Sequence, residues 1–223
     1  MSFIFHVLCT LIFTRVWLWH FTPEAAELPG SKGFGWFFRY LTFCSYTLQM
    51  ALFVISCLCQ LVGKPQTRRR LERASDRLAC ALFPIACTVS LMYYALESTT
   101  QGLVERGGFN RPDWLDFAVH GGNSLAAWGD LLLAPSRSFS TASLTLSIGL
   151  GMLYLTWCMV VRIGYGKFPY PILNKLPFPH GLLGMAGAAL VLIIGWFYLG
   201  LLVRRLVRGG RKPATATATK KAD

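Results

Sequence analysis

Four polar or ionisable side chains interrupt an apolar segment, residues 114–134, that is long enough to cross a membrane. Each residue of an α-helix is turned 100° from the one before it, so all four fall within a narrow arc of one helix face. An unpaired charge in hydrocarbon is costly, and such residues usually face the interior of a helix bundle. The pattern predicts an inward polar stripe, serving either as hydrogen-bonding glue between helices or as a reactive site. The four residues are Asp116, His120, Asn123 and Asp130.

A second polar stripe lies on residues 39–63 and includes Thr42. In an arrangement of six spans, this segment and the one carrying His120 enter the membrane from the same side. Each residue follows a tryptophan, Trp36 or Trp114, by six positions, and tryptophan favours the membrane interface. Both side chains should therefore lie at a similar depth, about 9 Å below the interface at 1.5 Å per residue. A hydroxyl and an imidazole at one depth are the minimum for a base-activated nucleophile.

Other polar residues could support or replace this chemistry. Asp116 lies one helical turn before His120 and could orient its ring, as the third member of a catalytic triad does. Arg39 and Tyr46 could donate hydrogen bonds to a developing oxyanion or hold a carboxylate headgroup, and the sequence does not separate these roles. Asn123 is expected to join helices. The alternative for Thr42 is a hydrogen bond to the carbonyl four residues earlier, which is usual for Thr in membrane helices.

The composition of the 223 residues predicts the scaffold that must position these side chains. Hydrophobic residues make up 54% and charged residues 14%, whereas soluble domains carry about 25% charged residues. We expect an all-α polytopic membrane protein, with one domain of about six transmembrane helices over residues 1–208 and a disordered basic cytosolic tail over 209–223. The six predicted spans are residues 2–21, 39–63, 78–97, 114–134, 142–163 and 181–203.

The basic residues predict the orientation of this bundle. Fourteen of the 22 Lys and Arg residues lie between the second and third spans, at Arg137, or after the last span. Basic loops remain cytosolic, so both termini are expected in the cytosol. The net charge of +12 is thus a topology signal and predicts no nucleic-acid partner. The flanks and helix lengths fit the endoplasmic reticulum or another endomembrane.

The cysteines and histidines predict no cofactor. All seven cysteines fall within predicted spans, whereas a disulfide framework would use exposed loops, so we expect free thiols and no metal cluster. His6 and His20 are 14 residues apart and share a helix face, as haem ligands would. No other predicted span offers a matching pair, so a haem electron carrier is disfavoured.

The connection between the fifth and sixth spans is rich in proline and aromatic residues. Its four prolines exclude one continuous helix, and Tyr165, Phe168, Tyr170 and Phe178 are suited to the headgroup level. It is expected to be an interfacial loop or a lid over a lipid pocket. If it is a lid, it should cover the mouth of a cavity shared by Thr42 and His120.

Three blocks of sequence resemble one known family in order and spacing. They are FRYLTF (38–43), DWLDFAVH (113–120) and YLTWCMVVRIGYGKFPYPIL (154–173). They are similar to blocks of the androgen-induced gene 1 and androgen-dependent tissue-factor-pathway-inhibitor-regulating protein family. The resemblance implies a multi-pass membrane fold, and some members are threonine hydrolases of fatty acid esters of hydroxy fatty acids. The family nucleophile then falls on Thr42 and the catalytic histidine on His120.

The chain departs from the animal members beside the histidine. Those members carry a second histidine three residues earlier and a threonine directly after, where this chain has Phe117 and Gly121. The resemblance therefore indicates a divergent branch of the family.

Two hypotheses of function follow. In the first, the protein is an intramembrane lipid ester hydrolase: Thr42 attacks the ester carbonyl, His120 transfers the proton, and the substrate enters from the bilayer. In the second, it is a non-catalytic multi-pass membrane adaptor or transporter, and the polar stripe is glue or a permeation path. The sequence identifies no protein partner.

Overall fold

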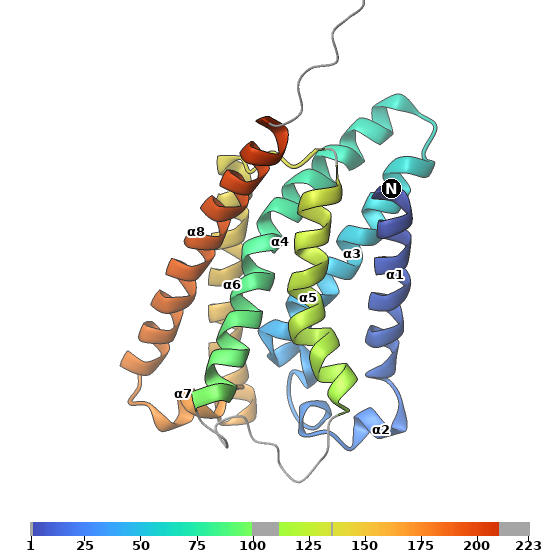
Figure 1. Ribbon diagram of the computed structural model, residues 1–223. Helices are drawn as coiled ribbons and strands as arrows, with labels where there is room; N and C mark the ends of the chain where they lie inside the picture. The colour runs from blue at the N-terminus through green and yellow to red at the C-terminus, as the bar shows by residue number, and fades with distance from the viewer. Residues whose placement is uncertain (1, 100–111, 135, 210–223) are drawn as a thin grey trace, which may run out of the picture.

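The computed structural model describes residues 2–99, 112–134 and 136–209, and these residues contain helices but no strand. Six long helices lie side by side in a bundle (Figure 1). Five of them, all but α5, are long and apolar enough to cross a membrane, which confirms the predicted all-α polytopic fold. The long helices are α1 (Ser2–Trp19), α3 (Leu41–Leu61), α4 (Pro65–Thr99), α5 (Asp113–Leu133), α6 (Thr141–Tyr165) and α8 (His180–Gly209).

Short elements occupy one end of the bundle. The connection from α1 to α3 contains α2 (Pro23–Ala26) and the 3₁₀ turns η1 (Pro29–Ser31) and η2 (Trp36–Arg39), and α7 (Pro171–Lys175) precedes α8. The start of α1 and the end of α8 both lie at the opposite end of the bundle, on different sides of it (Figure 1). The helices α3 and α5 both begin at the end that carries α2 and α7, so they run in the same direction.

The third long helix begins earlier than predicted. α4 starts at Pro65 rather than near residue 78, so most of the expected basic connection is helical. Proline suits the first position of a helix, where its missing N–H is not needed. Arg68 then forms an ion pair at 2.8 Å with Glu72, one turn later. The positive charges therefore lie on an exposed extension of α4 rather than on an irregular loop.

Local signals at both ends of α6 explain its boundaries. The hydroxyl of Ser140 accepts a hydrogen bond from the Ser143 amide at 3.3 Å, which caps the N-terminus. Gly166 follows the last residue with φ of 79°, a left-handed conformation that glycine adopts without strain. The helix therefore ends before the proline-rich connection begins.

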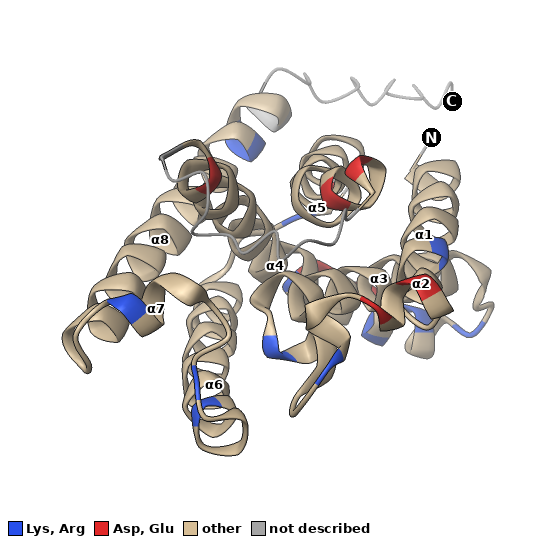
Figure 2. Cartoon of the chain, turned by 90° about the horizontal axis from the view of Figure 1, so that it is seen from below, with Lys and Arg blue, Asp and Glu red and all other residues tan. Residues whose placement is uncertain are grey.

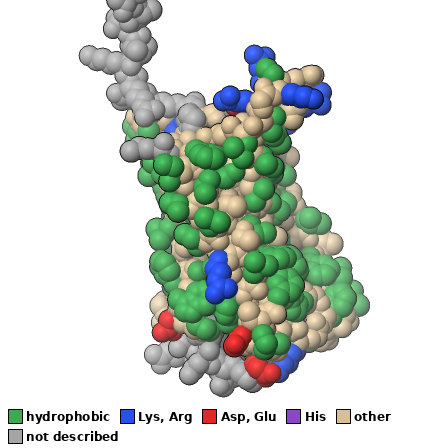
Figure 3. Space-filling model, turned by 90° about the vertical axis from the view of Figure 1, so that its right-hand side faces the viewer, with side chains coloured by type: hydrophobic (Ala, Val, Ile, Leu, Met, Phe, Trp, Pro, Cys, Tyr) green, Lys and Arg blue, Asp and Glu red, His purple; other side chains and the backbone are tan. Residues whose placement is uncertain are grey.

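The helix α4 lies at the centre of the bundle and packs against α3, α5, α6 and α8. Phe13, Tyr46, Phe53 and Val119 belong to a buried cluster between α1, α3 and α5. Large hydrophobic side chains on the outside remain exposed, as lipid contacts require (Figure 3). The bundle thus has an apolar exterior and an interior that also holds polar groups.

Charged residues of both signs lie at the end that carries α2 and α7, which faces the viewer in Figure 2. Glu24 lies in the first turn of α2, and Asp113 and Asp116 lie in the first turn of α5. Arg162 and Lys175 lie in the last turns of α6 and α7.

The predicted tail, residues 209–223, falls beyond the described residues except for Gly209.

Candidate functional site

One set of hydrogen bonds fixes the register of α3 and α5. The Asn123 amide Nδ2 donates to the Ser45 hydroxyl at 3.2 Å, and the Gln49 amide Nε2 donates to the Asn123 carbonyl at 3.2 Å. Thr42 precedes Ser45 by three residues, and His120 precedes Asn123 by three. Because the helices run in the same direction, Thr42 and His120 lie at one level, a turn nearer the end with α2. Within the described chain no hydrogen bond joins these two side chains directly.

The ring of His120 is held in one orientation. The residue is 4% exposed, and its Nδ1 lies 3.0 Å from the carbonyl oxygen of Asp116. A carbonyl only accepts hydrogen bonds, so the neutral ring carries its proton on Nδ1 and keeps a lone pair on Nε2. The Asp116 carboxylate Oδ1 lies 3.4 Å from the same nitrogen. The arrangement leaves Nε2 as the atom that can take a proton.

Tyr93 of α4 completes the surroundings of this histidine. Its ring is stacked on that of His120, with centroids 3.5 Å apart and planes inclined by 5°. Its hydroxyl donates to the Asp116 carboxylate Oδ2 at 2.6 Å. Tyr93 was not among the residues predicted from the sequence, where its only signal is the Tyr93–Tyr94 pair near the end of an apolar span. Nothing in that pair shows which ring turns towards α5.

The hydroxyl of Thr42 lacks the hydrogen bond that three other helical threonines make to their own helix. Thr10, Thr47 and Thr156 each donate to the carbonyl four residues earlier, at 2.8, 2.8 and 3.1 Å. Thr42 is the second residue of α3, so the carbonyl four residues earlier, that of Phe38, precedes the helix. Trp157 Nε1 and Cys44 Sγ donate to that carbonyl instead, at 2.9 and 3.0 Å. Among the described residues the Thr42 hydroxyl has no hydrogen-bond partner.

The two proposed donors near Thr42 are placed very differently. The buried guanidinium of Arg39 donates to the carbonyls of Lys32, at 2.8 Å, and of Pro29, and lies 4.5 Å from the centre of the Tyr165 ring. It fastens the segment before α3. Tyr46 stacks on Phe13 of α1, with centroids 4.2 Å apart. Its buried hydroxyl makes no hydrogen bond to any described residue.

The aromatic connection between α6 and α8 touches the start of α3. The Leu41 amide donates to the Tyr170 hydroxyl at 3.0 Å. The Tyr154 hydroxyl, from α6, donates to the Arg39 carbonyl at 2.8 Å and lies 3.3 Å from the Tyr170 hydroxyl. This segment therefore reaches the residue directly before Thr42.

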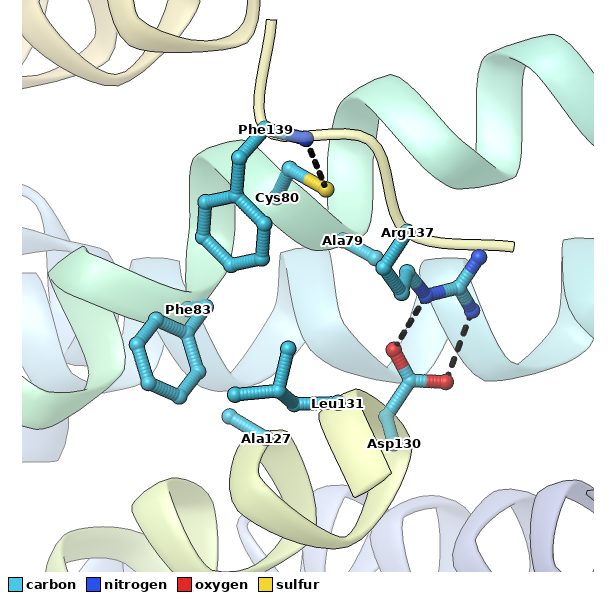
Figure 4. Close-up of a pocket in the computed structure, with 8 residues that line it drawn as sticks. All are labelled: Ala79, Cys80, Phe83, Ala127, Asp130, Leu131, Arg137 and Phe139. Carbon is cyan, nitrogen blue, oxygen red and sulfur yellow. Dashed lines mark hydrogen bonds and ion pairs between the residues drawn. The ribbon is translucent and has the colours of Figure 1, made fainter. Parts of the chain in front are cut away.

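The last residue of the polar stripe belongs to a separate cluster at the other end of α5. The Asp130 carboxylate accepts two hydrogen bonds from the Arg137 guanidinium, both at 2.7 Å (Figure 4). His6 Nε2 lies 2.8 Å from the same carboxylate. All three side chains are buried, beside a small pocket that Cys80, Phe83 and Phe139 help to line (Figure 4). The cluster ties α1, α5 and the connection to α6 together.

His20 and the cysteines offer no site of their own within the described chain. His20 Nδ1 lies 2.9 Å from the Val16 carbonyl, inside its own helix. All seven cysteines are free thiols, and no group of three potential ligands among the described residues could hold a metal ion.

Comparison with known proteins identifies a family. The chain matches the family model described as FAR-17a/AIG1-like protein over residues 1–203. No curated protein and no solved structure matches it.

Proposed function

We propose, on the premise that the chain belongs to the FAR-17a/AIG1-like protein family, that it is an intramembrane hydrolase of lipid esters. The supporting observation is the state of His120, whose Nδ1 faces the Asp116 carbonyl at 3.0 Å and whose Nε2 is thereby a base. It stands at the level of Thr42, a hydroxyl with no hydrogen-bond partner among the described residues. An unpaired hydroxyl at the same depth as an oriented base is the starting point that nucleophilic catalysis needs.

The proposed reaction has two steps. His120 Nε2 takes the Thr42 proton while Oγ attacks the ester carbonyl, and the protonated ring then gives that proton to the departing alkoxide. An acyl ester on Thr42 results. Water then attacks this ester with the same base, which releases the fatty acid and restores the hydroxyl. The Asp116 carboxylate, 3.4 Å from Nδ1, stabilises the positive charge on His120 in both steps.

The proposed substrate is a fatty acid ester, such as an ester of a hydroxy fatty acid, that enters laterally from the bilayer. The bundle supports this route because its sides are apolar and the chain between its helices forms no soluble domain within the described residues. We place the protein in the endoplasmic reticulum or another endomembrane. Both termini are assigned to the cytosol, since the basic extension of α4 and the end of α8 lie at one end of the bundle.

The test uses purified full-length protein in lipid nanodiscs with a panel of lipid esters and a fluorophosphonate probe. Thr42→Ala should abolish both hydrolysis and labelling. The matched control is Thr156→Ala, since Thr156 lies exposed on α6 and donates to its own helix. Hydrolysis that survives in Thr42→Ala would refute the proposed nucleophile. A wild type that hydrolyses none of the esters would favour a membrane adaptor or transporter.

A further inference from the structure

Two tyrosine hydroxyls meet where α3 begins. Tyr170 is the residue directly before α7, and Tyr154 lies in the middle of α6. The Tyr170 oxygen accepts a hydrogen bond from the Leu41 amide at 3.0 Å, and the Tyr154 oxygen lies 3.3 Å away from it. Neither residue belongs to the polar stripes on α3 and α5.

Only one of these two hydroxyls still has a proton to donate. Tyr154 donates its one proton to the Arg39 carbonyl at 2.8 Å and, at the longer distance of 3.3 Å, towards the Tyr170 oxygen. The Tyr170 proton then has no acceptor among the described residues. The 3.3 Å contact between the two hydroxyls is long, since O–H···O bonds cluster near 2.7–2.8 Å. Tyr170 also accepts a bond from Leu41, which polarises its own O–H and strengthens it as a donor.

The place of this hydroxyl is as important as its proton. The Tyr170 hydroxyl is hydrogen-bonded to the backbone amide of Leu41, the residue directly before Thr42. If Thr42 Oγ attacks an ester carbonyl, the oxyanion that forms is only two covalent bonds away from that Oγ. The guanidinium of Arg39 is already engaged by the carbonyls of Pro29 and Lys32. The Tyr46 hydroxyl lies within the cluster shared with α1.

We propose that Tyr170 donates the hydrogen bond that stabilises the oxyanion formed when Thr42 attacks an ester carbonyl. This proposal rests on the proposed hydrolase function. Tyr170 is then a catalytic residue, and Tyr154 is a positioning residue whose hydroxyl holds that of Tyr170 beside the start of α3. The proline-rich connection thereby supplies a reactive group.

The test compares Tyr170→Phe with wild type in nanodiscs, using p-nitrophenyl palmitate as substrate. Removal of one oxyanion donor lowers kcat by about 10²–10³-fold. We expect this loss in kcat with KM changed less than about threefold, because the bond forms only in the transition state. Affinity for a palmityl trifluoromethyl ketone, which forms an oxyanion on reaction with the nucleophile, should fall in parallel. The matched control is Tyr198→Phe, because it removes a tyrosine hydroxyl from an exposed side chain on α8.

A second replacement keeps the test decisive if Tyr170→Phe does not fold. 3-Fluorotyrosine at position 170 keeps the ring and both contacts but has a more acidic hydroxyl. Because a deprotonated hydroxyl cannot donate, the fall in kcat at alkaline pH should move to lower pH.

The outcomes separate this proposal from the hydrolase function. Full kcat in folded Tyr170→Phe, or an unchanged alkaline limb with 3-fluorotyrosine, overturns the role of Tyr170 while Thr42-dependent hydrolysis persists. If wild type shows no Thr42-dependent hydrolysis at all, the proposed function fails and Tyr170 loses its role with it.

Discussion

Tyr93 lies flat against His120, with ring centroids 3.5 Å apart, and at the same time its hydroxyl donates to Asp116 at 2.6 Å. One side chain on α4 therefore holds both the imidazole and the carboxylate that α5 presents. The position of the candidate base, His120, therefore depends on how α4 packs against α5.

The first prediction separates the two contacts of Tyr93. Tyr93→Phe keeps the stacking and loses the bond to Asp116, so kcat should fall by about tenfold, a part of the 10²–10⁴-fold that acid–base catalysis supplies. Tyr93→Leu loses both contacts, so its kcat should be lower still. Ester hydrolysis with melting temperature as the stability control measures this. Tyr94→Phe, at the neighbouring and exposed position, should keep its activity. Equal kcat in Tyr93→Phe and wild type would show that the bond to Asp116 is not used.

The second prediction treats Thr42 and His120 as a unit. Thr42→Ala and His120→Ala should each remove nearly all turnover, and the double variant should be little worse than either. Thr42→Ser should keep part of the activity because a hydroxyl remains. Steady-state kinetics of the four variants in nanodiscs measures this. Losses that multiply in the double variant would mean that the two side chains act independently.

The third prediction concerns stability at the other end of α5. Asp130→Ala leaves the buried Arg137 without its carboxylate, and breaking a buried pair costs about 3–5 kcal/mol. The double variant Asp130→Leu with Arg137→Leu should be more stable than Asp130→Ala, since no unpaired charge remains. Denaturant titration of the reconstituted protein measures both.

The control for this prediction is Glu72→Gln. It breaks the exposed Arg68–Glu72 pair, whose N···O distance of 2.8 Å resembles those of the buried pair. A loss below about 1 kcal/mol is expected there. Equal losses for Glu72→Gln and Asp130→Ala would contradict the role given to burial.

The fourth prediction concerns topology. The start of α1 and the end of α8 lie at the same end of the bundle as the basic extension of α4 (Figure 1), so both termini should be cytosolic. A glycosylation acceptor inserted after Arg211 should remain unmodified in microsomes. The same acceptor inserted in the connection between α4 and α5 should be modified. The reverse pattern would show that both termini lie on the luminal side and would contradict the predicted orientation.

The sequence predicts the fold well because the signal is strong at the level of whole helices. Apolar runs of about 20 residues leave few alternatives, and the stripe on α5 repeats every three or four residues. The start of α4 was missed because the prediction followed hydropathy, and the residues from Pro65 to Arg77 are helical through local bonding and charge pairing instead.

The candidate site is predictable only in part. Thr42 and His120 follow from depth and family resemblance, since each lies on a helix whose direction is set by topology. The engagement of Arg39 by two carbonyls and the stacking of Tyr93 depend on how η1 and α4 pack, which no periodicity encodes. The residues of the stripe on α5 also have different roles. Asn123 links α5 to α3 through Ser45, whereas Asp130 pairs with Arg137 at the other end of α5. The sequence pattern does not distinguish these roles, because they depend on the partner of each side chain.

The buried cluster around Asp130 has a consequence for the order of assembly. His6 and Asp130 are 124 residues apart, so α1 is synthesised long before its partner carboxylate exists. Asp130 in turn receives Arg137 only when the chain has continued beyond α5. Until then each polar group lies in the membrane unpaired or bound to water. The N-terminal helix thus gains its contact with this cluster only after four of the six long helices of the described chain have been made. Earlier intermediates hold it by apolar packing and by the hydrogen bond that Trp17 donates to Thr47 of α3.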